Sequence, residues 1–181
     1  RELGAALASL RKPPALVVTD SQAFRAVADA TPSEVPMTSF SILLARAKGD
    51  LAEMVRGATA IGRLAPGDRV LVVDACSHHP VEEDIARVKI PAWLAAKAGG
   101  PLETVHFQGR DWPADLSSFR LVVHCGACML NRREMLSRLA RARDAGVPVT
   151  NFGLAIAWSL GLFERALGPF PDALAAWREA Q

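Results

Sequence analysis

Continuous apolar runs separated by segments with apolar residues at helical spacing dominate the chain. The apolar runs and other strand-like segments are residues 15–19 (ALVVT), 36–40, 69–74 (RVLVVD), 103–107, 120–124 (RLVVH) and 147–151. The segments with helical spacing are residues 2–10, 22–30, 41–61, 91–98, 131–145, 154–162 and 172–180. Runs that are apolar at nearly every position are typical of parallel strands buried on both faces. Strands alternating with helices predict an α/β fold with a parallel, doubly wound (Rossmann-like) sheet.

The turn residues of GRLAPGD, at positions 62–68, predict a boundary between two units. The first unit, residues 1–66, is expected to be a small α/β domain with too few elements to cover both faces of a parallel sheet. The second unit, residues 67–181, carries the main sheet. The chain also begins without a methionine, so we expect it to be part of a longer protein.

Composition limits the classes of function. Of the 181 residues, 50% are hydrophobic and 22% are charged, which is enough apolar material for a packed core. The net charge is only +2, and the arginines form no basic run, so a nucleic-acid partner is not expected. No apolar stretch reaches the roughly 20 residues of a membrane span, and no signal peptide is evident, so we expect a cytoplasmic protein without a membrane partner. Three cysteines are an odd number that favours metal or thiol chemistry over a disulfide framework.

Two short motifs place side chains of metal-ligand type directly after predicted strands. ACSHHP places Cys76 and His78 after one strand, and HCGAC places His124, Cys125 and Cys128 after another. The carboxyl ends of neighbouring parallel strands meet at one edge of a sheet, where ligands bind in open α/β folds. The motifs therefore predict that the sulfur atoms lie close together.

Several kinds of site remain open at this edge. A Cys125-x-x-Cys128 pair alone is compatible with a redox dithiol, a zinc site, an iron–sulfur site or an inert pair. Cys76 argues against a simple dithiol, which needs no third thiol. Zinc would accept three cysteines with His78 or His124, whereas a 4Fe-4S cluster on three cysteines leaves one iron with a weaker ligand or an open position. The ample core argues mildly against structural zinc.

The remaining polar residues near the motifs have ordinary interpretations. His124 ends its strand, and because adjacent residues point to opposite faces it serves equally well as a ligand or as a residue behind the ligands. Glu82 and Glu83 offer carboxylate oxygens. Asn131 is expected to cap the helix after the cysteines. The arginines of that helix are expected to form a solvated face; they are Arg132, Arg133, Arg138, Arg141 and Arg143.

The motif stretches resemble the HydF family, the GTPase maturation factors of FeFe-hydrogenases. The resemblance lies in ACSHHPVEEDIARVKIPAWL and HCGACMLNRREMLSRLARARDAGVPVTNFGLAIAW, with RKPPALVVTDSQAF and TSFSILLARAKGDL. It implies a dimerisation domain followed by a domain that binds a 4Fe-4S cluster, whereas the family's GTPase domain is missing from this sequence. By position, it implies Cys76, Cys125 and Cys128 as cluster ligands. The position of the family's fourth ligand would fall to His78, His124 or Glu83.

The resemblance also implies a function, which for this chain is non-enzymatic. The family acts as a scaffold and carrier that receives a diiron precursor with carbonyl, cyanide and dithiolate ligands from radical-SAM maturation enzymes. It delivers this precursor to the FeFe-hydrogenase apoprotein, and a homodimer is expected. The alternative from the residues is a structural zinc (Cys3His) domain that serves protein–protein docking, and a thiol oxidoreductase ranks third.

Overall fold

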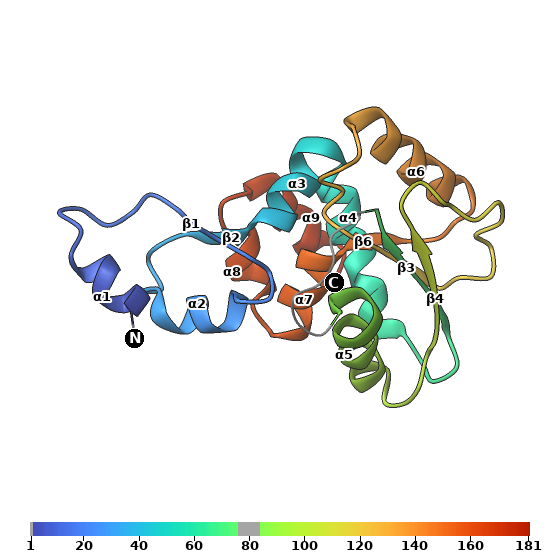
Figure 1. The fold of residues 1–181 in the computed structure, drawn as a ribbon, viewed down its shortest axis with the longest axis horizontal. Helices are drawn as coiled ribbons and strands as arrows, with labels where there is room; N and C mark the ends of the chain where they lie inside the picture. Colours follow the sequence, from blue (N-terminus) through green and yellow to red (C-terminus); the bar gives the residue numbers. More distant parts are fainter. Residues whose placement is uncertain (1, 76–83) are drawn as a thin grey trace.

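The computed structural model describes residues 2–75 and 84–181 and contains two parallel sheets with helices around them (Figure 1). The first part of the chain forms α1 (Glu2–Ala8), β1 (Val17–Thr19), α2 (Phe24–Ala30), β2 (Met37–Ser39), α3 (Phe40–Lys48), α4 (Leu51–Ala58) and the 3-10 helix η1 (Thr59–Arg63). The second part forms β3 (Arg69–Asp74), a π-helical turn η2 (Ile85–Lys89), α5 (Ile90–Ala98), β4 (Glu103–Gln108), β5 (Leu121–His124), α6 (Arg132–Asp144), β6 (Val149–Asn151), α7 (Phe152–Ser159), α8 (Phe163–Leu167) and α9 (Pro171–Glu179).

The prediction of a single helix over residues 41–61 is wrong. Gly49 leaves the helical conformation with φ −107° and ψ −148°, and α3 ends there. The side chain of Asp50 then accepts a hydrogen bond of 2.9 Å from the amide of Glu53 and caps a new helix, α4. Glycine weakens a helix interior and aspartate is a favoured N-cap, so the two residues together start a second helix in place of one long helix.

The larger sheet has the strand order β4-β3-β5-β6, and all its pairs are parallel. The connection from β3 to β4 runs in the opposite direction across the sheet from the connection from β5 to β6. Because parallel crossovers are right-handed, α5 and α6 cover opposite faces, as Figure 1 shows. The predicted doubly wound parallel α/β fold is therefore confirmed.

The main core lies between this sheet and its helices. Val70, Leu71, Val122 and Val123 have no exposed surface, as expected for central parallel strands. Helix α4 approaches β6 so closely that a Cβ added at Gly57 would lie 2.0 Å from the carbonyl oxygen of Val149. Residues before the predicted boundary at position 66 thus pack against the main sheet, and a division into units 1–66 and 67–181 stays a prediction.

The short helix α8 and the length and polarity of the helices are two further features of the fold. Helix α8 was not predicted, since five residues are too few to give a clear helical period. Over residues 2–75 and 84–181, the helices are all too short or too polar to cross a membrane.

Candidate metal centre

The turn from β5 into α6 carries two cysteines at the carboxyl edge of the larger sheet. Strand β5 ends at His124, residues 125–130 form the turn, and α6 begins at Arg132. Asn131 accepts a hydrogen bond of 2.9 Å from the amide of Glu134, so the predicted helix cap is confirmed. Cys125 is buried and Cys128 is exposed, and this turn therefore offers one thiol from the interior and one at the surface.

Two backbone amides donate hydrogen bonds to the sulfur of Cys125. It accepts hydrogen bonds from the amide of Ala75, at 3.2 Å, and from the amide of Ala127, at 3.3 Å. The amide of Cys125 in turn donates to the carbonyl oxygen of Val73, at 2.8 Å. Ala127 reaches its position through a φ of 55°, a left-handed conformation that is uncommon for alanine. Amide donors of this kind stabilise sulfur in its charged form and occur around iron–sulfur sites.

The predicted ligands in and just after the first motif lie outside the described residues. These are Cys76, His78 and Glu83, together with their neighbours His79 and Glu82. Ala75, whose amide donates to the Cys125 sulfur, directly precedes Cys76 in the sequence. Within residues 2–75 and 84–181, no three histidine, cysteine or acidic side chains gather in a metal-binding group. The convergence of three sulfurs therefore stays a prediction.

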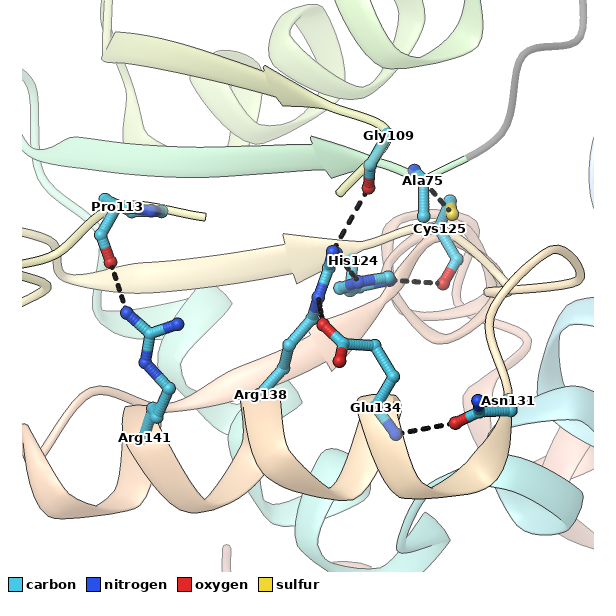
Figure 2. Close-up of polar contacts among 9 residues, drawn as sticks. All are labelled: Ala75, Gly109, Pro113, His124, Cys125, Asn131, Glu134, Arg138 and Arg141. Carbon is cyan, nitrogen blue, oxygen red and sulfur yellow. Dashed lines mark hydrogen bonds and ion pairs between the residues drawn. The ribbon is translucent and has the colours of Figure 1, made fainter. Parts of the chain in front are cut away.

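His124 points towards α6 and uses both ring nitrogens in hydrogen bonds (Figure 2). Its Nε2 lies 3.0 Å from the Arg138 guanidinium, which can only donate, so Nε2 accepts. Its Nδ1 then carries the proton and donates to the carbonyl oxygen of Cys125 at 2.9 Å. Burial, opposed by the hydrogen bond to Cys125 and reinforced by the charge of Arg138, lowers the pKa of His124 to about 4. His124 is thus a neutral residue whose lone pair is directed at Arg138.

Arg138 is not part of a solvated helix face, and that prediction is wrong. Its side chain is 1% exposed. Besides His124, it donates to the carbonyl oxygen of Gly109 at 3.1 Å and to Glu134 at 3.2 Å. Its guanidinium carbon lies 5.1 Å from the centre of the Trp112 ring, which is a cation–π contact. Figure 2 shows the side chain extending from α6 towards His124 and the carbonyl group of Gly109.

A signal for Arg138 was present in the sequence. Position 138 lies on the same face of α6 as the buried residues Met135, Leu139 and Ala142. An arginine in an apolar helical stripe, one turn after a glutamate, indicates a buried cation with partners. Lys48 of α3 is a second cation at this site, and nothing in the sequence indicated its role. It donates to carbonyl oxygens of the turn at residues 125–130, which we call the cysteine turn. Its partners are far away in the sequence, and no local pattern identifies them.

The donors of this turn fit a thiolate-bound metal. Cys125 and Cys128 share one short turn, and both zinc and iron–sulfur clusters favour thiolate ligands at this spacing. The amide donors to Cys125 match the stabilisation that an anionic cluster requires. The residues present are therefore compatible with the 4Fe-4S cluster that the family resemblance implies.

Comparison with protein families assigns nearly the whole chain. Residues 1–49 match the model described as the hydrogen maturase F dimerization domain. Residues 52–169 match the model described as the hydrogen maturase F tetramerization domain. The comparison with individually curated proteins gave no match.

Proposed function

The chain belongs to the hydrogen maturase F family, and from this we propose that it acts in hydrogenase maturation as an iron–sulfur scaffold and carrier. Both matched segments are oligomerisation domains by their descriptions, which supports an oligomeric protein. We propose that the role of this chain is binding and transfer rather than catalysis.

We assign Cys76, Cys125 and Cys128 as the ligands of a 4Fe-4S cluster. One observation supports this assignment best. The Cys125 sulfur accepts a hydrogen bond of 3.2 Å from the amide of Ala75, so it lies beside the end of the strand that precedes Cys76. The cluster supplies one iron without a cysteine ligand, where an exchangeable ligand binds. The cysteine turn holds the cluster, and its buried amides stabilise thiolate charge.

His78 and Glu83 are the better candidates for the fourth position. The Nε2 lone pair of His124 is directed at Arg138, so binding a metal through it would leave a guanidinium N–H without its acceptor in a buried site. We propose that His124 instead orients the Cys125 carbonyl from behind the ligands.

The cargo in this proposal is a diiron precursor with carbonyl, cyanide and dithiolate ligands. Radical-SAM maturation enzymes supply it, and the FeFe-hydrogenase apoprotein receives it. The site holds the precursor by adjoining the exchangeable position, and the exposed position of Cys128 keeps this edge of the sheet accessible to partner proteins.

Anaerobic reconstitution with iron and sulfide tests the assignment. About four irons and four sulfides per chain are expected, with visible absorption that bleaches on reduction and an EPR signal in the reduced state. Replacing Cys76, Cys125 or Cys128 with serine should abolish or strongly reduce cluster content. Met129→Ser is the matched control, because Met129 is exposed beside Cys128 and is not a proposed ligand.

The zinc alternative predicts a different result. A protein that retains one zinc per chain and takes up no sulfide would contradict the cluster assignment. A cluster that forms equally well in Cys76→Ser would contradict the three-cysteine set.

A further inference from the structure

Lys48, at the end of α3, binds the cysteine turn through its ammonium group. Its Nζ donates to the carbonyl oxygens of Ala127 at 2.9 Å, Cys128 at 2.7 Å and Leu130 at 2.7 Å. An ammonium group has three protons, and these three carbonyls account for all of them. The contacts span the turn from the residue before Cys128 to the end of the turn.

The start of α6, directly after the turn, binds the end of α3 in return through Arg132. The guanidinium of Arg132 donates to the carbonyl oxygens of Ala47, at 2.9 Å, and Gly49, at 3.2 Å. These carbonyls lie at the end of α3, where helices lack intrahelical donors. Each segment thus supplies one cation to the carbonyl groups of the other. We call these contacts of Lys48 and Arg132 the reciprocal clamp.

The positive charge of Lys48 stands close to the proposed cluster ligands. Its partners are carbonyl groups, and among the described residues no carboxylate forms an ion pair with it. Lys48 is partly buried, so solvent screens its charge less than at the surface. A cluster with three thiolates is anionic, and a cation bound to the carbonyl of one ligand stabilises that charge.

The clamp also connects the two segments that match separate family models. Lys48 lies in residues 1–49, which match the dimerisation domain, and the cysteine turn lies in residues 52–169, which match the tetramerisation domain. Helix α3 packs beside α6, the helix that follows the turn. Any displacement of the end of α3 therefore reaches the turn through these hydrogen bonds.

We infer that Lys48 is a positioning residue for the cluster, which keeps the Cys125–Cys128 turn in its ligating conformation and makes cluster retention depend on the dimerisation segment. This inference rests on the proposed function for its cluster-related part. Its structural part, the immobilisation of the turn by Lys48, applies to the metal-free protein as well.

Lys48→Met, Lys48→Arg and the control Lys12→Met test the inference in the full chain. Methionine keeps the unbranched shape of the lysine side chain and removes its charge. Arginine keeps the charge, but its planar fork does not match three carbonyls converging on a tetrahedral ammonium. Lys12 is exposed, and replacing it controls for the loss of one positive charge.

The metal-free proteins are compared first, by hydrogen exchange of a peptide that covers residues 125–131. Lys48→Met should raise exchange in this peptide roughly tenfold, as expected when at least one hydrogen bond to a charged group is lost. Lys48→Arg should raise it less, and Lys12→Met should leave it unchanged. Thermal unfolding of each variant shows whether the fold is intact.

The reconstituted proteins are compared second, by the rate of iron release to a chelator and by the midpoint potential of the cluster. Lys48→Met should release iron roughly tenfold faster than wild type. Its potential should shift to more negative values, because reduction adds negative charge that the ammonium no longer stabilises. Lys48→Arg should keep a potential close to that of wild type.

Two outcomes overturn the inference. One is unchanged exchange of the turn in Lys48→Met, and the other is unchanged iron release and potential in a variant whose turn exchanges faster. If wild type binds no cluster at all, the proposed function and the cluster-related part fail together. In that case, faster exchange in Lys48→Met still supports the immobilisation of the turn.

Discussion

Replacement of Arg138 with methionine should destabilise the protein, although α6 would lose a charged residue from its interior. The substitution removes the donor to His124 Nε2, which stays buried with 0% exposure. A buried acceptor without a partner destabilises by about 1 to 3 kcal/mol. The carbonyl of Gly109 also loses its donor, at a cost of about 1 kcal/mol because this bond is only partly buried.

The other contributions to the change in the free energy of unfolding are smaller or opposite in sign. The pair with Glu134 contributes less than about 1 kcal/mol, because the glutamate side chain is 47% exposed. Removing the guanidinium also removes the free-energy cost of keeping a cation out of water, which offsets part of the loss. We therefore expect a net loss of about 2 to 3 kcal/mol in the free energy of unfolding.

Urea denaturation followed by circular dichroism measures this loss. Protomer concentration must be the same for all variants, since oligomerisation contributes to apparent stability. Arg141→Met is the matched control, because Arg141 lies one turn later on α6 but is exposed. Its guanidinium carbon lies 6.0 Å from the centre of the Trp112 ring, and it donates a hydrogen bond of 2.9 Å to the carbonyl oxygen of Pro113. The control should lose less than about 1 kcal/mol. A loss for Arg138→Met that is no larger than that of the control would refute this reasoning.

Substitutions at Gly57 and Asp50 test how α4 packs and how it is capped. Gly57→Ala should destabilise by about 3 kcal/mol or more, because its Cβ would lie 2.0 Å from the Val149 carbonyl oxygen, and thermal unfolding measures the effect. Gly4→Ala, with nothing within 4 Å of its added Cβ, should change stability by less than about 1 kcal/mol, and equal effects at both glycines would contradict the packing. Asp50→Ala should cost about 1 kcal/mol through loss of the cap to Glu53, whereas Asp50→Ser should retain most of that stability in urea denaturation; indistinguishable alanine and serine variants would argue against the cap.

The regular elements of the main sheet were predictable because their signals are local. Residues 70–73 and 121–123 are uninterrupted apolar runs, and the structure has strands at Arg69–Asp74 and Leu121–His124. The break at Gly49 was not predicted as a helix end, although glycine followed by aspartate combines a weak helix former with a good cap. The spacing of apolar residues alone predicted one helix, since the apolar residues before and after Gly49 fit one helical face.

Prediction of the site was more limited. The cysteine turn and its Asn131 cap follow from the strand-to-helix transition, which short-range sequence signals reveal. Arg138 was taken for a solvated residue because a charged residue on an arginine-rich helix is usually exposed, and only its place in the buried stripe indicates otherwise. The contacts of Lys48 join residues 79 to 82 positions apart, and such pairs depend on how α3 packs against the turn.

The two cations act on opposite ends of the cysteine turn. Arg138 orients His124, which donates to the carbonyl of Cys125 at the start of the turn. In the rest of the turn, Lys48 binds the carbonyl groups of Ala127, Cys128 and Leu130. The amide of Ala127, whose carbonyl binds Lys48, also donates to the Cys125 sulfur, so a change at Lys48 alters the environment of that sulfur without any direct contact. Residues that supply no ligand to the proposed cluster can therefore influence it, and one of them lies in the segment that matches the dimerisation domain.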